Sequence, residues 1–173
     1  MHLLHLLRHA KSRWRDDVED HARPLSKRGQ REARRVGRHL PGAVPPIDLV
    51  LCSSAVRTRQ TLDFVVAGPN PPPRCLVEDA LYLADGERLL DRLRQLDEGC
   101  RNVMLIGHNP GIHDLAVTLA DPEGGGARAL LAGKFPTAAR ASFAVDAPWC
   151  ELGRRRCRVV AYVPPSALPD EDD

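Results

Sequence analysis

Four side chains with the chemistry to bind and transfer an anionic group stand next to strand-like segments of the sequence. These residues are Arg8, His9, Arg57 and His108. Arginine and histidine at the end of a buried strand are costly to desolvate unless an anion meets them there. The pattern therefore predicts a site that receives an anionic ligand.

A phosphoryl group is the anion that suits these residue types. A guanidinium presents a planar fork of N–H donors that matches phosphate oxygens in a bidentate way. A neutral imidazole keeps a lone pair on one ring nitrogen and can attack phosphorus. A second imidazole can stabilise the group that is being transferred. Two arginines and two histidines in one pocket therefore predict phosphoryl transfer.

The four residues can meet only if the fold brings several strand ends to one place. Strand-like runs at 2–8, 48–53 and 102–107 alternate with helix-like runs, as is typical of α/β proteins with a largely parallel sheet. The carboxyl ends of parallel strands share one edge of the sheet, where ligands bind. We therefore expect a single three-layer α/β domain, with a mostly parallel central sheet and helices on both faces.

Further elements complete the expected domain, which spans residues 1–163. Helices are expected at 27–40, 56–67, 85–96 and 111–120, and further strands at 75–77, 141–145 and 158–163. Ser26 has the residue type of a helix N-cap, and Pro41 is expected to end the same helix. The stretch 121–134 contains three consecutive glycines and is expected to form a loop. The acidic, proline-rich segment 164–173 is expected to be a disordered tail.

Composition narrows the class of protein further. The 173 residues are 43% hydrophobic and 28% charged, with a net charge of +2, which provides no global field for binding nucleic acid. No apolar run approaches the roughly 18 residues that cross a bilayer, and the start lacks the pattern of a signal peptide. We therefore expect a cytoplasmic protein without nucleic-acid or membrane partners. The five cysteines lack the spacing of a zinc site or a disulfide framework.

The segments around the four side chains resemble the motifs of the histidine phosphatase superfamily, which includes the cofactor-dependent phosphoglycerate mutases. The matching segments, in the expected order, are Arg8-His9, residues 23–26 with Gly29, residues 53–61 and residues 107–111. The resemblance runs from residue 3 to about residue 163. The short chain and the sequence Gly-His-Asn-Pro-Gly are most similar to the SixA-type phosphohistidine phosphatases. The resemblance implies a phosphoglycerate-mutase-like fold, and no metal or cofactor is expected.

Roles for individual residues follow from this resemblance. It implies that His9 is the nucleophile that becomes phosphorylated. Arg8 and Arg57 would hold the phosphoryl oxygens, and His108 would complete the pocket. Further predicted substrate-binding residues are Lys11, Ser12 and Asn109.

Three positions bear on how far the resemblance extends. Ala10 stands where the superfamily usually has glycine, which would strain the backbone if φ there were positive. Lys11 replaces a glutamate common in the mutases and argues against mutase activity. Asp79 is the nearest candidate for a general acid, although it equally fits a solvated loop carboxylate. Because imidazole is a far better leaving group than an alkoxide, a phosphohistidine substrate has little need for such an acid.

The sequence therefore predicts a phosphatase that removes phosphate from phosphohistidine in proteins such as histidine phosphotransfer domains. Two other functions stay open: hydrolysis of a small phosphorylated metabolite, and phosphate binding without turnover. The partner is accordingly a phosphorylated protein or a small phosphorylated metabolite. A cysteine-based phosphatase built on Cys52 and Arg57 is disfavoured, because only four residues separate them and the glycines of such a loop are missing.

Overall fold

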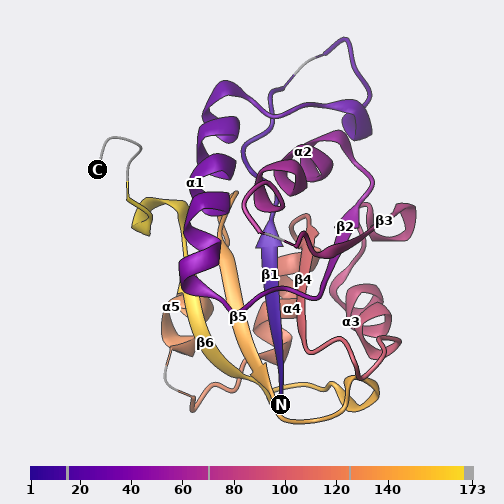
Figure 1. The fold of residues 1–173 in the computed structure, drawn as a ribbon, viewed down its shortest axis with the longest axis vertical. Coiled ribbons are helices and arrows are strands. Elements are labelled where there is room, and N and C mark those ends of the chain that lie inside the picture. The colour runs from indigo at the N-terminus through magenta and orange to yellow at the C-terminus, as the bar shows by residue number, and fades with distance from the viewer. Residues whose placement is uncertain (15, 70, 125, 170–173) are drawn as a thin grey trace.

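A six-stranded sheet forms the centre of the computed structural model, which describes residues 1–14, 16–69, 71–124 and 126–169 (Figure 1). Its strands are β1 (His2–Arg8), β2 (Leu49–Ser53), β3 (Arg74–Glu78), β4 (Asn102–Gly107), β5 (Arg140–Val145) and β6 (Arg158–Val163). They lie in the order β3-β2-β4-β1-β5-β6. Strands β1 to β4 are parallel, whereas β5 runs antiparallel to both of its neighbours, β1 and β6. The prediction of a mostly parallel sheet is confirmed.

Helices cover both faces of this sheet. They are α1 (Lys27–Ala43), α2 (Val56–Val65), α3 (Gly86–Arg94), α4 (Gly111–Leu119) and α5 (Ala127–Ala132). Short 3₁₀ helices are η1 (Asp20–Ala22), η2 (Asp79–Leu81), η3 (Trp149–Glu151) and η4 (Pro165–Ala167). Helices α1 and α2 contribute to one hydrophobic core, and α3, α4 and α5 contribute to the other (Figure 1). This arrangement gives the predicted three layers.

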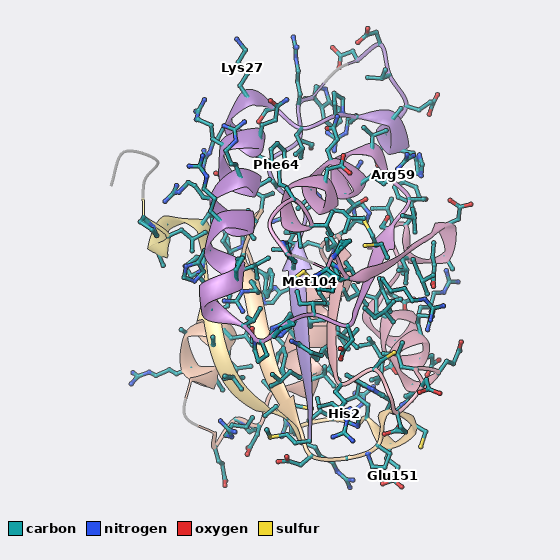
Figure 2. The ribbon with its side chains drawn as sticks, viewed as in Figure 1. His2, Lys27, Arg59, Phe64, Met104 and Glu151 are labelled. Atoms are coloured by element: carbon teal, nitrogen blue, oxygen red, sulfur yellow. The ribbon has the colours of Figure 1, made fainter. Side chains whose placement is uncertain are left out.

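Successive side chains of each central strand enter the two cores in turn. In β4, Val103 and Leu105 join the core under α3 to α5, whereas Met104 and Ile106 join the core under α1 and α2. Met104 is fully buried, and its label lies near the centre of the view in Figure 2. Full burial of one such side chain stabilises the fold by roughly 1.5–3 kcal/mol. The strand is therefore held firmly, and so is the residue that follows it.

Helix α1 begins as predicted and ends later than predicted. The Ser26 side chain caps it by accepting a hydrogen bond from the Gly29 N–H at 3.0 Å. The prediction that Pro41 ends the helix is wrong, because α1 continues to Ala43. Proline removes only its own N–H donor, so the residues after Pro41 can still donate to carbonyls one turn earlier in the helix. The N–H of Val44, for example, donates to the carbonyl of Leu40 at 3.0 Å.

Two segments differ from the expected loop and tail. Within 121–134, residues 127–132 form α5, because Ala-Arg-Ala-Leu-Leu-Ala consists of strong helix formers and two of its apolar side chains are buried. Within 164–169, Pro165–Ala167 forms η4, and Leu168 is buried in the core under α1. The rest of the expected tail, 170–173, lies outside the described residues. No helix in the described parts of the chain is long and apolar enough to cross a membrane.

Candidate active site

The ends of β1 and β4 bring two histidines side by side. The two strands are parallel neighbours, with Arg8 in register with Gly107. The next residue of each strand is a histidine, and the N–H of His9 bonds to the carbonyl of Gly107 at 3.0 Å. The ring centroids of His9 and His108 are 5.2 Å apart. The edge predicted from the strand pattern therefore holds both imidazoles.

His9 is held in the tautomer that a nucleophile needs. Its Nδ1 atom lies 2.7 Å from the carbonyl oxygen of Ala10. Because a carbonyl oxygen only accepts hydrogen bonds, Nδ1 carries the proton and Nε2 keeps its lone pair. Burial is the main cause that lowers the pKa of His9 to about 4, and the positive charges of Arg57 and Arg8 lower it further. The imidazole is therefore neutral at pH 7.

Arg57 reaches this site from the first turn of α2 and is only 3% exposed. Its Nη1 donates to the main-chain carbonyl of Asp20 at 2.7 Å, and its Nη2 donates to Asp20 Oδ2 at 3.0 Å. The same Nη2 lies 3.3 Å from Nδ1 of His108. The Nε atom of Arg57 is buried without a hydrogen-bond partner among the described residues. A buried N–H donor of this kind is ready to receive an anionic acceptor.

His108 is neutral as well. A guanidinium only donates, so Nδ1 of His108 accepts from Arg57 and the proton is on Nε2. That nitrogen donates to Oγ of Ser53 at 2.7 Å, which ties the ring to the end of β2. Burial is the main cause that lowers the pKa of His108 to about 3, followed by the neighbouring His9 and Arg57. The end of β2 and the first turn of α2 therefore fix the position of this imidazole.

Arg8 and Asn109 share an acceptor. Nη1 of Arg8 and Nδ2 of Asn109 both donate to the carbonyl of Phe135, each at 2.9 Å. In the described part of the chain, Nε of Arg8 and Oδ1 of Asn109 are buried without a hydrogen-bond partner. The structure thus places Asn109 beside Arg8, and both retain polar atoms that a ligand can satisfy.

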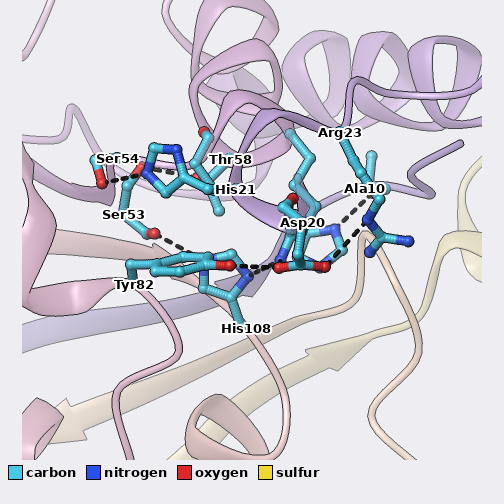
Figure 3. Close-up of polar contacts among 12 residues, drawn as sticks. Ala10, Asp20, His21, Arg23, Ser53, Ser54, Thr58, Tyr82 and His108 are labelled. Atoms are coloured by element: carbon cyan, nitrogen blue, oxygen red, sulfur yellow. Dashed lines mark hydrogen bonds and ion pairs between the residues drawn. The ribbon is translucent and has the colours of Figure 1, made fainter. Parts of the chain in front are cut away.

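Several residues of this cluster were not predicted from the sequence (Figure 3). Oδ2 of Asp20 accepts a hydrogen bond from the Tyr82 hydroxyl at 2.5 Å, and Oδ1 lies 3.1 Å from Nε of Arg23. His21 pairs with Oγ of Ser54 at 2.8 Å, and its ring meets Tyr82 edge-on. Arg23 could have been found, because it belongs to a segment that resembles the superfamily. Asp20 is one of several acidic residues in an irregular loop, and no sequence pattern distinguishes it from the others.

The remaining predicted residues lie around the cluster. Asp79 is exposed at the start of η2, where its main-chain carbonyl accepts from the N–H of Tyr82. Lys11 is exposed and Ser12 is half-buried; through their backbones they contact Ser26 and its neighbour Leu25. The described contacts join neither their side chains nor that of Asp79 to the two imidazoles. Their roles stay predictions.

Ala10 fits its place without the strain considered above. Leu83, Ala138 and Arg155 are the non-glycine residues with positive φ in the described ranges, and Ala10 is not among them. Its side chain is buried in the core under α1, and its N–H donates to Oγ1 of Thr61 at 3.1 Å. Alanine at this position therefore does not disturb the site.

Charge in the pocket favours a dianion. Three guanidinium groups, from Arg8, Arg23 and Arg57, and one carboxylate, from Asp20, stand around the two neutral imidazoles. Three positive charges and one negative charge give this cluster a net charge of +2. A phosphoryl group carries about two negative charges at neutral pH. The site therefore balances the charge of a phosphoryl group.

Comparison with known proteins agrees with this chemistry. Residues 4–81 match the family model of the histidine phosphatase superfamily, branch 1. An uncharacterised protein of Mycobacterium tuberculosis is 35% identical over 148 residues, which cover 84% of this chain and 91% of the relative.

Two solved structures extend the likeness over nearly the whole chain. A candidate phosphohistidine phosphatase SixA from Nakamurella multipartitia superposes with a TM-score of 0.83 at 27% identity, covering 95% of this chain and 96% of that one. The protein histidine phosphatase SixA, solved in complex with tungstate, superposes with a TM-score of 0.77 at 26% identity, covering 95% and 97%. The chain belongs to the histidine phosphatase superfamily, in which it is a SixA-like phosphatase.

Proposed function

We propose that this phosphatase hydrolyses phosphohistidine through a phosphorylated His9. The observation that carries the proposal is the contact between Nδ1 of His9 and the Ala10 carbonyl, because it directs the lone pair of Nε2 toward a ligand. Nε2 attacks the phosphorus atom, and the substrate imidazole leaves. Arg8 and Arg57 hold the phosphoryl oxygens, and water then hydrolyses the phosphorylated His9. This scheme uses the neutral nucleophile and the surplus positive charge of the pocket.

The carboxylate nearest to the pocket favours phosphohistidine over a phosphomonoester. An ester releases an alkoxide, which needs a proton from an acid. Asp20 is the carboxylate that contacts the cluster, but the hydrogen bond from Tyr82, followed by the contacts with Arg57, lowers its pKa below the ordinary value. Asp20 is therefore ionised at neutral pH and is a poor acid. An imidazole leaving group does not depend on it.

Exposed apolar side chains beside the pocket support a protein substrate. Trp14 is 73% exposed, and the guanidinium carbon of Arg23 lies 4.8 Å from the centre of its ring. Leu83 is 54% exposed and follows Tyr82 directly in the chain. Its φ of 50° is a left-handed conformation that leucine rarely adopts. Exposed aromatic and aliphatic groups of this kind are typical anchors of protein interfaces, and a small metabolite would not need them.

A substrate panel tests this function. It compares a phosphotransfer domain phosphorylated on histidine with free phosphohistidine, sugar phosphates and nucleotides. We expect kcat/KM for the phosphorylated domain to exceed that for the sugar phosphates and nucleotides by at least about 10²-fold, since specific contacts of about 3 kcal/mol give that ratio. A preference for a sugar phosphate or a nucleotide would identify a small-molecule phosphatase. Binding of phosphate without any turnover would identify a binding module.

A further inference from the structure

We propose that Asp20 is the catalytic base of the second step, in which water attacks phosphorylated His9. The inference rests on the proposed function, because it assigns a role within the same site. It differs from the sequence prediction, which sought an acid for the first step and placed it at Asp79.

Asp20 lies at the border between the buried cluster and solvent. Its side chain is 45% exposed, whereas Arg57, His9 and His108 are buried. In-line displacement at phosphorus requires the attacking water to stand opposite the nitrogen that leaves. Because His9, His108 and Arg57 are buried, the attacking water approaches from the solvent side of the cluster. The Asp20 carboxylate combines exposure to solvent with contact to Arg57, so it can meet such a water.

The contacts of Asp20 fix its orientation and leave a lone pair of Oδ1 available. Oδ2 accepts from the Tyr82 hydroxyl and from Nη2 of Arg57, which also faces His108. These two bonds hold the carboxylate beside the donors that bind the phosphoryl group. Oδ1 is paired with Nε of Arg23 at 3.1 Å, and a carboxylate oxygen has a further lone pair for a proton.

The chemical step balances with water as the other reactant. The water oxygen forms a bond to phosphorus, and the bond between phosphorus and Nε2 of His9 breaks, returning its electron pair to the nitrogen. The water proton passes to Oδ1 of Asp20. Inorganic phosphate leaves, and Asp20 then releases the proton to solvent. His9 returns to the neutral form in which Nδ1 donates to the Ala10 carbonyl.

Other carboxylates near the pocket have different partners. Glu78 forms an ion pair with Arg92, with a contact of 2.7 Å between Oε1 and Nη2. Asp16 accepts from Nε1 of Trp14 at 2.8 Å, on the exposed loop. Asp79 is exposed, and its described contact to the site is made by its main chain. Among the described residues, Asp20 is the carboxylate in contact with Arg57.

The test follows the phosphorylated enzyme directly in Asp20→Asn. The amide keeps the size of the side chain and an acceptor oxygen, but it cannot take a proton at neutral pH. Enzyme is mixed with free phosphohistidine, quenched at short times, and analysed for phosphate on His9. We expect formation of phosphorylated His9 within about threefold of wild type. We expect its decay to be slower by about 10² to 10⁴-fold, so that it accumulates.

A second variant separates a base from a structural role. In Asp20→Ala, added formate supplies a small carboxylate, and we expect it to accelerate the decay of phosphorylated His9. The same formate should leave the wild-type decay unchanged. Because η1 contains no buried residue, neither variant removes core packing. Thermal unfolding of both variants checks that they are folded.

Asp91→Asn, at an exposed carboxylate of α3 that pairs with Arg94, is the matched control, and we expect wild-type formation and decay. The proposal is overturned if phosphorylated His9 decays at the wild-type rate in Asp20→Asn. It is also overturned if Asp20→Asn blocks formation instead, because Asp20 would then act by positioning Arg57. If wild type itself never carries phosphate on His9, the proposed function fails, which is a different result.

Discussion

Nδ1 of His9 lies 2.7 Å from the carbonyl oxygen of Ala10, the residue that follows it in the chain. This contact decides which ring nitrogen is protonated, and thereby which one keeps the lone pair that the proposed mechanism requires. The partner is a backbone atom, so no side-chain substitution at Ala10 removes it. The chemistry of the site is thus set by the turn after β1 as much as by the histidine itself.

Replacing His9, the proposed nucleophile, should abolish the reaction. We expect His9→Ala to lower kcat by at least about 10³-fold, since removal of a catalytic nucleophile has effects of this size. Intact-mass measurements after mixing with substrate should show covalently bound phosphate on the wild-type protein and none on His9→Ala. His39→Ala, in α1 and outside the cluster, is the control and should keep both properties. Full turnover by His9→Ala would contradict the mechanism.

The acidity of His9 can be measured by an NMR titration of its ring. We expect a midpoint near pH 4 for His9 and near pH 3 for His108, because burial lowers both pKa values. Both rings should then be neutral throughout the range from pH 6 to 8. A midpoint near the ordinary value of about 6.5 would show that the ring is solvated and would contradict the buried site.

The same shifts give stability a defined dependence on pH. In the unfolded chain each histidine takes up a proton near pH 6.5, whereas the folded rings resist protonation down to about pH 4. The unfolded state therefore binds more protons between these values, and the free energy of unfolding falls as the pH is lowered through this window. Above about pH 6.5 this contribution is complete. Urea unfolding at several pH values measures it.

Arg57 should not be replaceable by lysine. Its guanidinium contacts the main chain of Asp20, the Asp20 carboxylate and His108 at once, and one ammonium group cannot reproduce that fork. Loss of one or two charge-assisted hydrogen bonds predicts a fall in kcat/KM of at least about 10²-fold in Arg57→Lys. Arg59→Lys, exposed on the same helix, should behave as wild type. Equal activity of the two variants would argue against Arg57 as a phosphoryl ligand.

The four central side chains could be predicted because regular structure places them. Apolar runs and the parallel-sheet rule together locate the ends of β1 and β4, and Arg8, His9 and His108 occupy those ends. The first turn of α2 adds Arg57. Apolar periodicity is a property of the local sequence, and the carboxyl ends of parallel strands share one edge of the sheet, so the sequence contains this part of the site.

The position of Asp20 could not be predicted, because an irregular loop carries it. The loop between β1 and α1 includes several acidic residues, and the position of η1 in this loop places Asp20 in contact with Arg57. That turn is held by tertiary contacts, such as the bond of His21 to Ser54, that no local pattern reveals. Helix α5 was missed for another reason. The nearby glycines suggested a loop, although Ala127–Ala132 itself favours a helix.

Close packing between α1 and the segment after His9 depends on Gly29. A Cβ atom there would lie 2.0 Å from the carbonyl oxygen of Lys11, which is a backbone atom that cannot move aside cheaply. We expect Gly29→Ala to destabilise the fold by at least about 1–3 kcal/mol, measured by urea unfolding. Gly42→Ala, in the same helix with nothing within 4 Å, should be neutral or stabilising by up to about 1 kcal/mol. Equal effects at both positions would contradict this packing.

The exposed apolar side chains beside the pocket should matter only for a protein substrate. Trp14 and Leu83 are both more than half exposed and flank the residues that surround the imidazoles. We expect the double variant Trp14→Ala, Leu83→Ser to lower kcat/KM for a phosphorylated phosphotransfer domain by at least about tenfold, because anchor residues at interfaces contribute more than about 1 kcal/mol each. Turnover of free phosphohistidine should stay within about twofold of wild type, since the pocket is intact.

Val160→Ser, 50% exposed on the edge strand β6, is the matched control and should change neither rate. Equal losses with both substrates would show that the variant disturbs the pocket. No loss with either would remove the support that Trp14 and Leu83 give to a protein substrate.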